Sequence, residues 1–219
     1  MIILAFETTG SKASVAIIDG AGSVTEKRSA GVLNHLQSLI PMTEELFGES
    51  GITAKDITCV AVSAGPGSFT GVRIGVATAR AFAQAMDIPC VAVPTLQSFL
   101  YNMENYRGWA CPVLDARRGE VYSGAFSLDE EGVIHEHIPG SACVLSGYLE
   151  ALREKAEEAG AGDITFFEDG MQRASSVARL GSKLYREGKA VSYKELTPQY
   201  MRKAEAERKL EAGHLFIKR

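Results

Sequence analysis

A glycine-rich stretch, SAGPGSFTGVRIGVATARA at residues 63–81, has the residue types and spacing of an anion-binding loop. Glycines at 65, 67 and 71 tolerate positive φ and allow a phosphate to approach the backbone closely. The stretch follows a β-branched run, and a helix begins near Thr70 after Ser68. A strand, a glycine turn and a helix N-terminus together form a nest of free N–H groups that suits a phosphate. The loop is not a Walker A motif, because no Gly-Lys-Ser/Thr ends it.

The same stretch has a second interpretation. Gly71, Gly75 and Ala79 recur every four residues and therefore give one face of the helix without bulky side chains. A second helix could pack closely on such a face. Spacing alone leaves both interpretations open.

Two further polar features could contribute to a site. Asp115 and Arg117 stand in a turn between two expected strands and could clamp a phosphate or a partner. The alternative is a polar turn with local ion pairs of little energetic weight. His35 is the only histidine of the first 105 residues, and a lone histidine indicates capping or packing because a catalytic one needs an orienting partner.

Several motifs spread along the chain resemble one known family. The segment PGSFTGVRIG is similar to the signature of the bacterial TsaB (YeaZ) family. Further matches to this family, in its order, are ILAFETT near the N-terminus, LNHLQSLIPM, DARRGEVY at 115–122 and PQYMR at 198–202.

The resemblance implies a partner subunit of the enzyme that installs threonylcarbamoyl on an adenosine of tRNA, with an actin/Hsp70/sugar-kinase-like fold. It implies pairing with the catalytic paralogue TsaD, contact with the ATPase TsaE and with tRNA through the complex, and a homodimer when the partner is absent. Thr8 and Thr9 would lie in the first phosphate hairpin of that fold. We expect ATP or ADP with Mg to bind only in the complex.

The chain departs from the working members of this superfamily at three places. Glu7 stands where those ATPases carry Asp, and its longer side chain cannot occupy the same geometry. Leu39 stands four residues after His35, where the catalytic relative has a second metal-binding histidine, so we expect no metal site. The loop after the last strand, Asp169-Gly170-Met171-Gln172, has one glycine where an adenosine loop has two. These departures predict a subunit that is not catalytic.

Two other functions are alternatives. An independent phosphotransferase of the sugar-kinase type is compatible with the glycine loop and the Thr8-Thr9 turn. A peptidase would need a nucleophile such as Ser68 beside His35, but the sequence has no GxSxG elbow.

Hydrophobic periodicity predicts an α/β protein whose pattern restarts near residue 106. The resemblance implies that its two related lobes, residues 1–105 and 106–219, are actin-like (ribonuclease H-like). Strands followed by helices predict mixed sheets flanked by helices, and Glu7 and Asp115 each end the opening strand of a lobe. We expect strands at 2–6, 13–18, 23–29, 58–63, 90–93, 110–114, 120–126 and 164–168, and helices at 34–49, 70–86, 96–103, 145–159 and 175–187.

The first of these helices has a wide apolar band, which suits a helix covered both by its own sheet and by a partner. Leu36, Ile40, Thr43 and Phe47 share one face of it, so we expect them in the interface together with Gly71, Gly75 and Ala79.

The composition is that of an ordinary globular protein, with a net charge of −4 that argues against general nucleic-acid affinity. No targeting or membrane-spanning segment is visible, and the four cysteines lack CxxC spacing, so we expect a cytoplasmic protein with free thiols. Only the tail from Arg202 is basic, with six cationic and three acidic residues. That tail could contact tRNA, dock on a partner or only aid solubility.

Overall fold

The first lobe is built on a five-stranded sheet. A computed structural model describes residues 1–30, 35–103 and 105–202, without the side chains of residues 35 and 36. In spatial order the strands are β3 (Val24–Arg28), β2 (Ser14–Ile18), β1 (Ile3–Glu7), β4 (Cys59–Gly65) and β5 (Cys90–Pro94). β1, β4 and β5 run parallel, and β2 and β3 are antiparallel to their neighbours.

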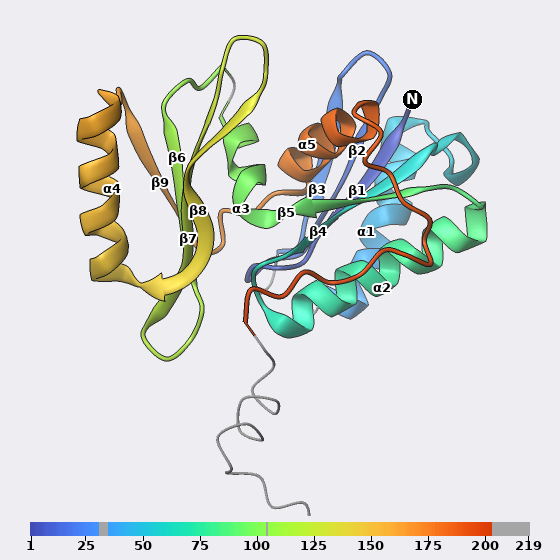
Figure 1. The fold of residues 1–219 in the computed structure, drawn as a ribbon. Helices are drawn as coiled ribbons and strands as arrows, with labels where there is room; N and C mark the ends of the chain where they lie inside the picture. The colour runs from blue at the N-terminus through green and yellow to red at the C-terminus, as the bar shows by residue number, and fades with distance from the viewer. Residues whose placement is uncertain (31–34, 104, 203–219) are drawn as a thin grey trace, which may run out of the picture.

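Helices cover both faces of this sheet (Figure 1). On one face lie α1 (His35–Ser50) and α2 (Phe69–Met86), and on the other α5 (Ala174–Arg186). Because successive side chains of a strand point to opposite faces, Leu4 and Phe6 pack with α1 and α2, whereas Ile3 and Ala5 pack with α5. This arrangement explains why the N-terminal strand is apolar without interruption from Ile3 to Phe6.

The second lobe has a four-stranded sheet. Its strands, in spatial order, are β8 (Ile134–Val144), β7 (Glu120–Leu128), β6 (Trp109–Asp115) and β9 (Ile164–Glu168). The helix α4 (Leu145–Ala159) covers one face, with Tyr148 and Leu152 in the core. The other face packs against α3 (Thr95–Ser98) and the 3-10 turn η2 (Phe99–Tyr101). A further 3-10 turn, η1, spans Ala54–Asp56 in the first lobe.

The two lobes repeat one topology, as the sequence predicts. In each lobe three strands form a meander, a helix follows, and the next strand pairs in parallel with the first strand of the meander. β1 ends at Glu7 and β6 ends at Asp115, which confirms the predicted correspondence of these two residues.

The chain exchanges segments between the lobes, which corrects the expectation that residues 106–219 form one lobe. α3 and η2, from the first half, pack on the second sheet. α5, from the second half, packs on β1, β2 and β4 of the first sheet. Val191 then forms an antiparallel bridge with Cys90 of β5. The sequence hides this exchange because each segment is amphipathic and would fit either sheet.

Within the described residues, no helix is both long enough and apolar enough to cross a membrane. The four cysteines are free thiols, and Cys59, Cys90 and Cys111 are buried. Burial raises the pKa of the Cys59 thiol to about 12. These thiols therefore stay protonated and pack as small apolar side chains.

Candidate functional site: the cleft between the lobes

A cleft of about 620 Å³ lies between the two lobes and is the candidate site. The first lobe contributes the turn after β1 and the N-terminus of α2, and the second lobe contributes the turn after β6. Of the residues predicted to bind phosphate, the cleft is lined by Thr9, Gly67, Ser68, Asp115 and Arg117. Residues from three distant parts of the chain therefore meet at one site.

The glycine loop presents the N-terminus of α2 to this cleft. Ser68 caps the helix, because its hydroxyl accepts a hydrogen bond from the Gly71 N–H at 3.2 Å. Gly67 has φ +153°, and a Cβ there would lie 2.6 Å from the Cβ of Thr9. Only glycine therefore fits between the two turns, and the positive end of the helix dipole faces the cleft.

Thr8 and Gly65 do not line the cleft, which corrects their assignment to a phosphate site. The Thr8 hydroxyl donates to the Gly71 carbonyl at 2.7 Å inside the lobe. Gly65 lies under the backbone of Gln199, whose carbonyl oxygen would be 2.2 Å from a Cβ at that position. Both residues fix the glycine loop and do not face a ligand.

Asp115 and Arg117 form a local ion pair at the rim of the cleft. The Arg117 guanidinium lies 3.1 Å from one Asp115 oxygen, and the Arg117 N–H donates to the other at 2.7 Å. The Arg117 side chain is 85% exposed, so the pair itself contributes little to stability. The pair is therefore the local one of the second interpretation. Because both residues also line the cleft, a clamp on a phosphate or a partner stays a prediction.

Glu7 is fully buried beneath the turn. One carboxylate oxygen accepts from the Thr9 N–H at 2.5 Å and from the Thr9 hydroxyl at 2.6 Å. The other oxygen has no hydrogen-bond partner among the described residues. Desolvation raises the pKa of Glu7, opposed by the Thr9 hydrogen bonds and increased by the charge of Asp169. Glu7 is not among the residues that line the cleft.

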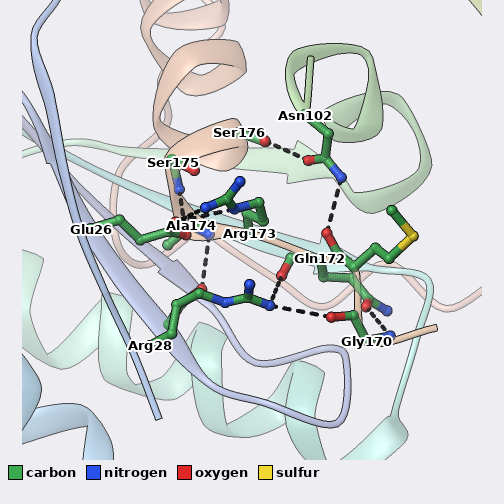
Figure 2. A network of polar contacts seen from close by, with 11 residues as sticks. Glu26, Arg28, Asn102, Gly170, Gln172, Arg173, Ala174, Ser175 and Ser176 are labelled. Atoms are coloured by element: carbon green, nitrogen blue, oxygen red, sulfur yellow. Dashed lines mark hydrogen bonds and ion pairs between the residues drawn. The ribbon is translucent and has the colours of Figure 1, made fainter. Parts of the chain in front are cut away.

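The loop between β9 and α5 is held against the first lobe by a polar network (Figure 2). Arg28 of β3 donates to the carbonyls of Gly170 and Gln172, and Glu26 accepts from Arg173 and from the Ser175 N–H. Asn102 donates to the Met171 carbonyl and accepts from the Ser176 hydroxyl.

Gln172 fills the space beside the first turn. It is buried, and its amide would lie within 2.5 Å of a Cβ at Gly10. The loop at Gly170, which has one glycine where the superfamily has two, is therefore packed against the turn after β1.

Residues 198–202 connect the glycine loop to the second lobe, a role that the sequence does not reveal. The Gln199 N–H donates to the Ala64 carbonyl at 2.7 Å, and Tyr200 stacks on Phe69 at 4.9 Å while accepting from Arg73. Arg202 pairs with Glu120 at 2.8 Å and donates to the Ala116 carbonyl. The PQYMR motif thus fixes the lobes relative to each other beside the cleft.

The small-residue face of α2 packs on the first lobe itself, so the prediction that it contacts a second helix is wrong. Gly71, Gly75 and Ala79 are buried. A Cβ at Gly71 would lie 1.9 Å from the Thr8 carbonyl oxygen, and one at Gly75 would lie 2.4 Å from the Thr8 hydroxyl. These three residues are small because α2 approaches β1 and β4 closely.

The predicted interface on α1 divides into an inner and an outer part. Thr43 is buried and its hydroxyl donates to the Leu39 carbonyl at 2.7 Å, which removes it from any interface. Phe47 is half-buried against Phe82 of α2, and Ile40 is 54% exposed. The side chain of Leu36 lies outside the described residues, as does that of His35. Ile40 and the rim of Phe47 remain accessible.

No cluster of three or more metal-ligating side chains occurs in the described part of the chain. The cleft does contain two carboxylates, Asp115 and Asp169, with Asp115 already paired to Arg117.

The order of the strands, the repeat of two lobes and the cleft between them define an actin-like, ribonuclease H-like protein. A family model for TsaD, described as tRNA N6-adenosine threonylcarbamoyltransferase, matches residues 26–214. The chain is 31% identical to the tRNA threonylcarbamoyladenosine biosynthesis protein TsaB of Bacillus subtilis, over 95% of this chain and 97% of that relative. It is 28% identical to TsaB of Escherichia coli, over 96% and 98%.

A solved structure supports the same fold. YeaZ of Pseudomonas aeruginosa superposes with a TM-score of 0.73 at 24% identity and covers 91% of this chain and 99% of its own. The tRNA N6-adenosine threonylcarbamoyltransferase of Streptococcus pneumoniae is 30% identical, but over only 51% of this chain and 38% of that enzyme. The chain belongs to the TsaB family.

Proposed function

We propose that this chain is a partner subunit in the synthesis of threonylcarbamoyladenosine in tRNA and does not itself transfer the group. The observation that carries this proposal is Glu7. A fully buried carboxyl with a raised pKa, bonded to the turn that follows it, cannot reach a metal or a substrate in the cleft. The fold is retained while the residue that would organise the chemistry has become part of the core.

The surface that pairs with TsaD is, in our proposal, the exposed side of α1 and α2. The helices are joined through Phe47 and Phe82, and Ile40 and Ala77 lie exposed on them. An exposed apolar side chain beside small residues can be covered by another helix, which removes apolar area from water. The same surface could pair with a second copy, so we propose a homodimer in the absence of TsaD.

The cleft would bind the phosphates of a nucleotide but would not receive its adenosine. The N-terminus of α2 and Arg117 suit a phosphate, and Asp115 and Asp169 supply oxygen ligands of the kind that Mg²⁺ prefers. Gln172 and the network of Figure 2 close the loop that would receive an adenosine. We therefore propose weak binding of ATP or ADP through the phosphates, completed within the complex.

The independent phosphotransferase remains a second candidate because the cleft and the glycine loop exist. It would require a base near the phosphate. Asp115 is ion-paired, Glu7 is buried, and Asp169 accepts a hydrogen bond from the Gln172 amide, so each of these carboxylates already has a structural role. ATP hydrolysis by the isolated chain that disappears in Glu7→Gln would favour this candidate over the partner subunit.

The test is reconstitution in which the chain, TsaD, TsaE or tRNA is omitted in turn. We expect threonylcarbamoyl transfer to tRNA to require TsaD and to be stimulated by this chain, which alone should transfer nothing. From this function we also propose that the protein is cytoplasmic. The basic tail, residues 203–219, lies outside the described residues, and its contact with tRNA stays an expectation. Transfer by the chain without TsaD would overturn the proposal.

A further inference from the structure

The described sheets have four edge strands, and three of them are protected. β3 carries Thr25, Glu26, Lys27 and Arg28 and is bonded to the loop before α5. β5 is bridged by Val191, with both hydrogen bonds at 2.8 Å. β8 carries charged residues and Pro139, and its pairing with β7 has two register shifts. Charges, prolines, irregular pairing and covering segments are the usual means of keeping an edge from pairing with other chains.

Within the described chain, β9 has no proline, no irregular pairing and no covering segment, and its one charged residue, Glu168, is its last. Its sequence is ITFFE, and it pairs on one side only, in parallel with β6. The Trp109 N–H donates to the Asp163 carbonyl, and hydrogen bonds alternate along a parallel strand. The backbone groups of Ile164 and Phe166 therefore point to the free edge, whereas those of Thr165 and Phe167 face β6.

The corresponding edge of the first sheet is covered by one further strand. There β4, which corresponds to β9, is followed by β5 on its outer side, in parallel register from Val60–Cys90 onward. In the second lobe the chain leaves β9 for α5 and returns to the first sheet. The second sheet thus has a fifth position that the described residues do not fill.

An apolar groove of about 490 Å³ runs beside this free edge. Its floor is formed by Leu149, Leu152, Ala156, Ala161, Ile164 and Phe166. Phe166 is 47% exposed and Leu149 41%, although each has apolar neighbours in the groove. An edge with an adjoining groove is the arrangement that binds an extended segment by strand addition, in which the backbone gives affinity and the groove gives selectivity.

The surroundings of the groove are acidic. The groove itself is lined by one carboxylate, Glu157, and one cation, Arg153. The flanking residues of α4, β9 and the turn between them add five carboxylates, in Glu150, Glu154, Glu158, Asp163 and Glu168, and one cation, in Lys155. An extended segment that is apolar at its centre and basic at its end would therefore fit best.

We propose that the last six residues of this chain, His214-Leu-Phe-Ile-Lys-Arg219, bind along the free edge of β9. They combine three consecutive apolar residues, of which Phe216 and Ile217 have high strand propensity, with two terminal cations. Strand addition would cover Phe166 and place Lys218 and Arg219 among the carboxylates. The inference does not depend on pairing with TsaD.

The connection is long enough for binding within one chain. Arg202 is fixed at Ala116 and Glu120, at the end of β6. Glu168 of β9 is paired with Val113 near that same end. Residues 203–213 lie between Arg202 and the segment, and eleven residues span up to roughly 36 Å when extended. β9, with five residues, is about 16 Å long, so the segment can reach either of its ends.

The test is amide hydrogen exchange of the full chain and of a chain that ends at Gly213. We expect the Ile164 and Phe166 amides to exchange at least about tenfold more slowly in the full chain, because only pairing at the free edge protects them. The amides of Thr165 and Phe167, which face β6, should be unchanged and serve as internal controls. A Leu215→Ser/Phe216→Ser/Ile217→Ser chain retains length and charge, and it should behave like the truncated one.

Two results would overturn the proposal. Equal exchange of Ile164 and Phe166 in the full and shortened chains would show that the segment does not bind there. Protection that disappears when the full chain is diluted would assign the added strand to a second copy. If the shortened chain does not fold, the serine variant makes the same comparison, and the synthetic peptide HLFIKR added to it should restore protection.

Discussion

Replacing Gly71 by alanine tests whether the small-residue face of α2 packs on its own lobe. The new Cβ would lie 1.9 Å from the Thr8 carbonyl oxygen, about 1.5 Å closer than ordinary contact at 3.4 Å. A backbone carbonyl cannot rotate away, and its movement would disturb the Thr8–Gly71 and Ser68–Thr9 hydrogen bonds. Overpacking of this kind destabilises a protein by about 1–3 kcal/mol, and a required backbone shift puts the cost near the upper end. The better helix propensity of alanine offsets about 0.5–1 kcal/mol of that cost.

We therefore expect Gly71→Ala to lower the free energy of unfolding by about 2 kcal/mol, or the thermal midpoint by roughly 4–8 °C for a domain of this size. The assay is thermal and urea unfolding followed by circular dichroism. Gly48→Ala is a matched control, since Gly48 is also helical but has nothing within 4 Å of a Cβ. It should stabilise the protein by about 0.5–1 kcal/mol.

The reasoning fails if Gly71→Ala unfolds like the native protein. If the variant instead kept its stability and lost association with TsaD, the face would be a contact between subunits, as its spacing first indicated.

Three further predictions concern the surface, the buried carboxyl and the connection between the lobes. Ile40→Glu should weaken association with TsaD by at least about tenfold without changing the thermal midpoint, because the side chain is exposed; Val133→Glu, exposed on a loop of the second lobe, is the control, and equal affinities would contradict the prediction. For Glu7, the folded-state pKa lies above 4.5, so the folded protein binds the extra proton and stability falls as pH rises from about 4.5 through the folded pKa. Glu7→Gln should remove this decline, so the difference between the two thermal midpoints should change as pH rises above about 4.5, and parallel profiles would contradict the raised pKa of Glu7. Arg202→Ala should cost about 1–2 kcal/mol by removing charged hydrogen bonds to Glu120 and the Ala116 carbonyl, and an unchanged urea midpoint would show that this contact is not stabilising.

The sequence predicts the elements and the repeat of the lobes because hydrophobic period and turn residues are local. The apolar strand at Ile3–Glu7 and the glycine turn before α2 are examples, and both lie where expected. The element that covers the Gly71 face cannot be predicted from the local sequence. An i, i+4, i+8 row of small residues is the same whether a sheet or a helix covers it, and Thr8, which decides the matter, lies 63 residues away.

The candidate site is predictable in its glycine loop, in the turn after β1 at Thr9 and in the turn at Asp115, but not in the segment that joins the lobes beside it. The PQYMR segment has no periodicity. Its backbone and the side chains of Tyr200 and Arg202 contact residues far along the chain, such as Ala64, Phe69 and Glu120. The exchange of α3 and α5 between lobes has the same cause, because amphipathicity fixes that a face is buried but not which sheet buries it.

The central claim, that the chain assists transfer without performing it, is tested most directly by the Glu7→Gln protein in the reconstituted reaction with TsaD, TsaE, ATP and tRNA. Glu7 is buried and bonded to Thr9, so a neutral residue of the same shape should support threonylcarbamoyl transfer at the native rate, within about twofold. A loss of a hundredfold or more, with the variant folded and still bound to TsaD, would show that Glu7 takes part in the chemistry and would contradict the account.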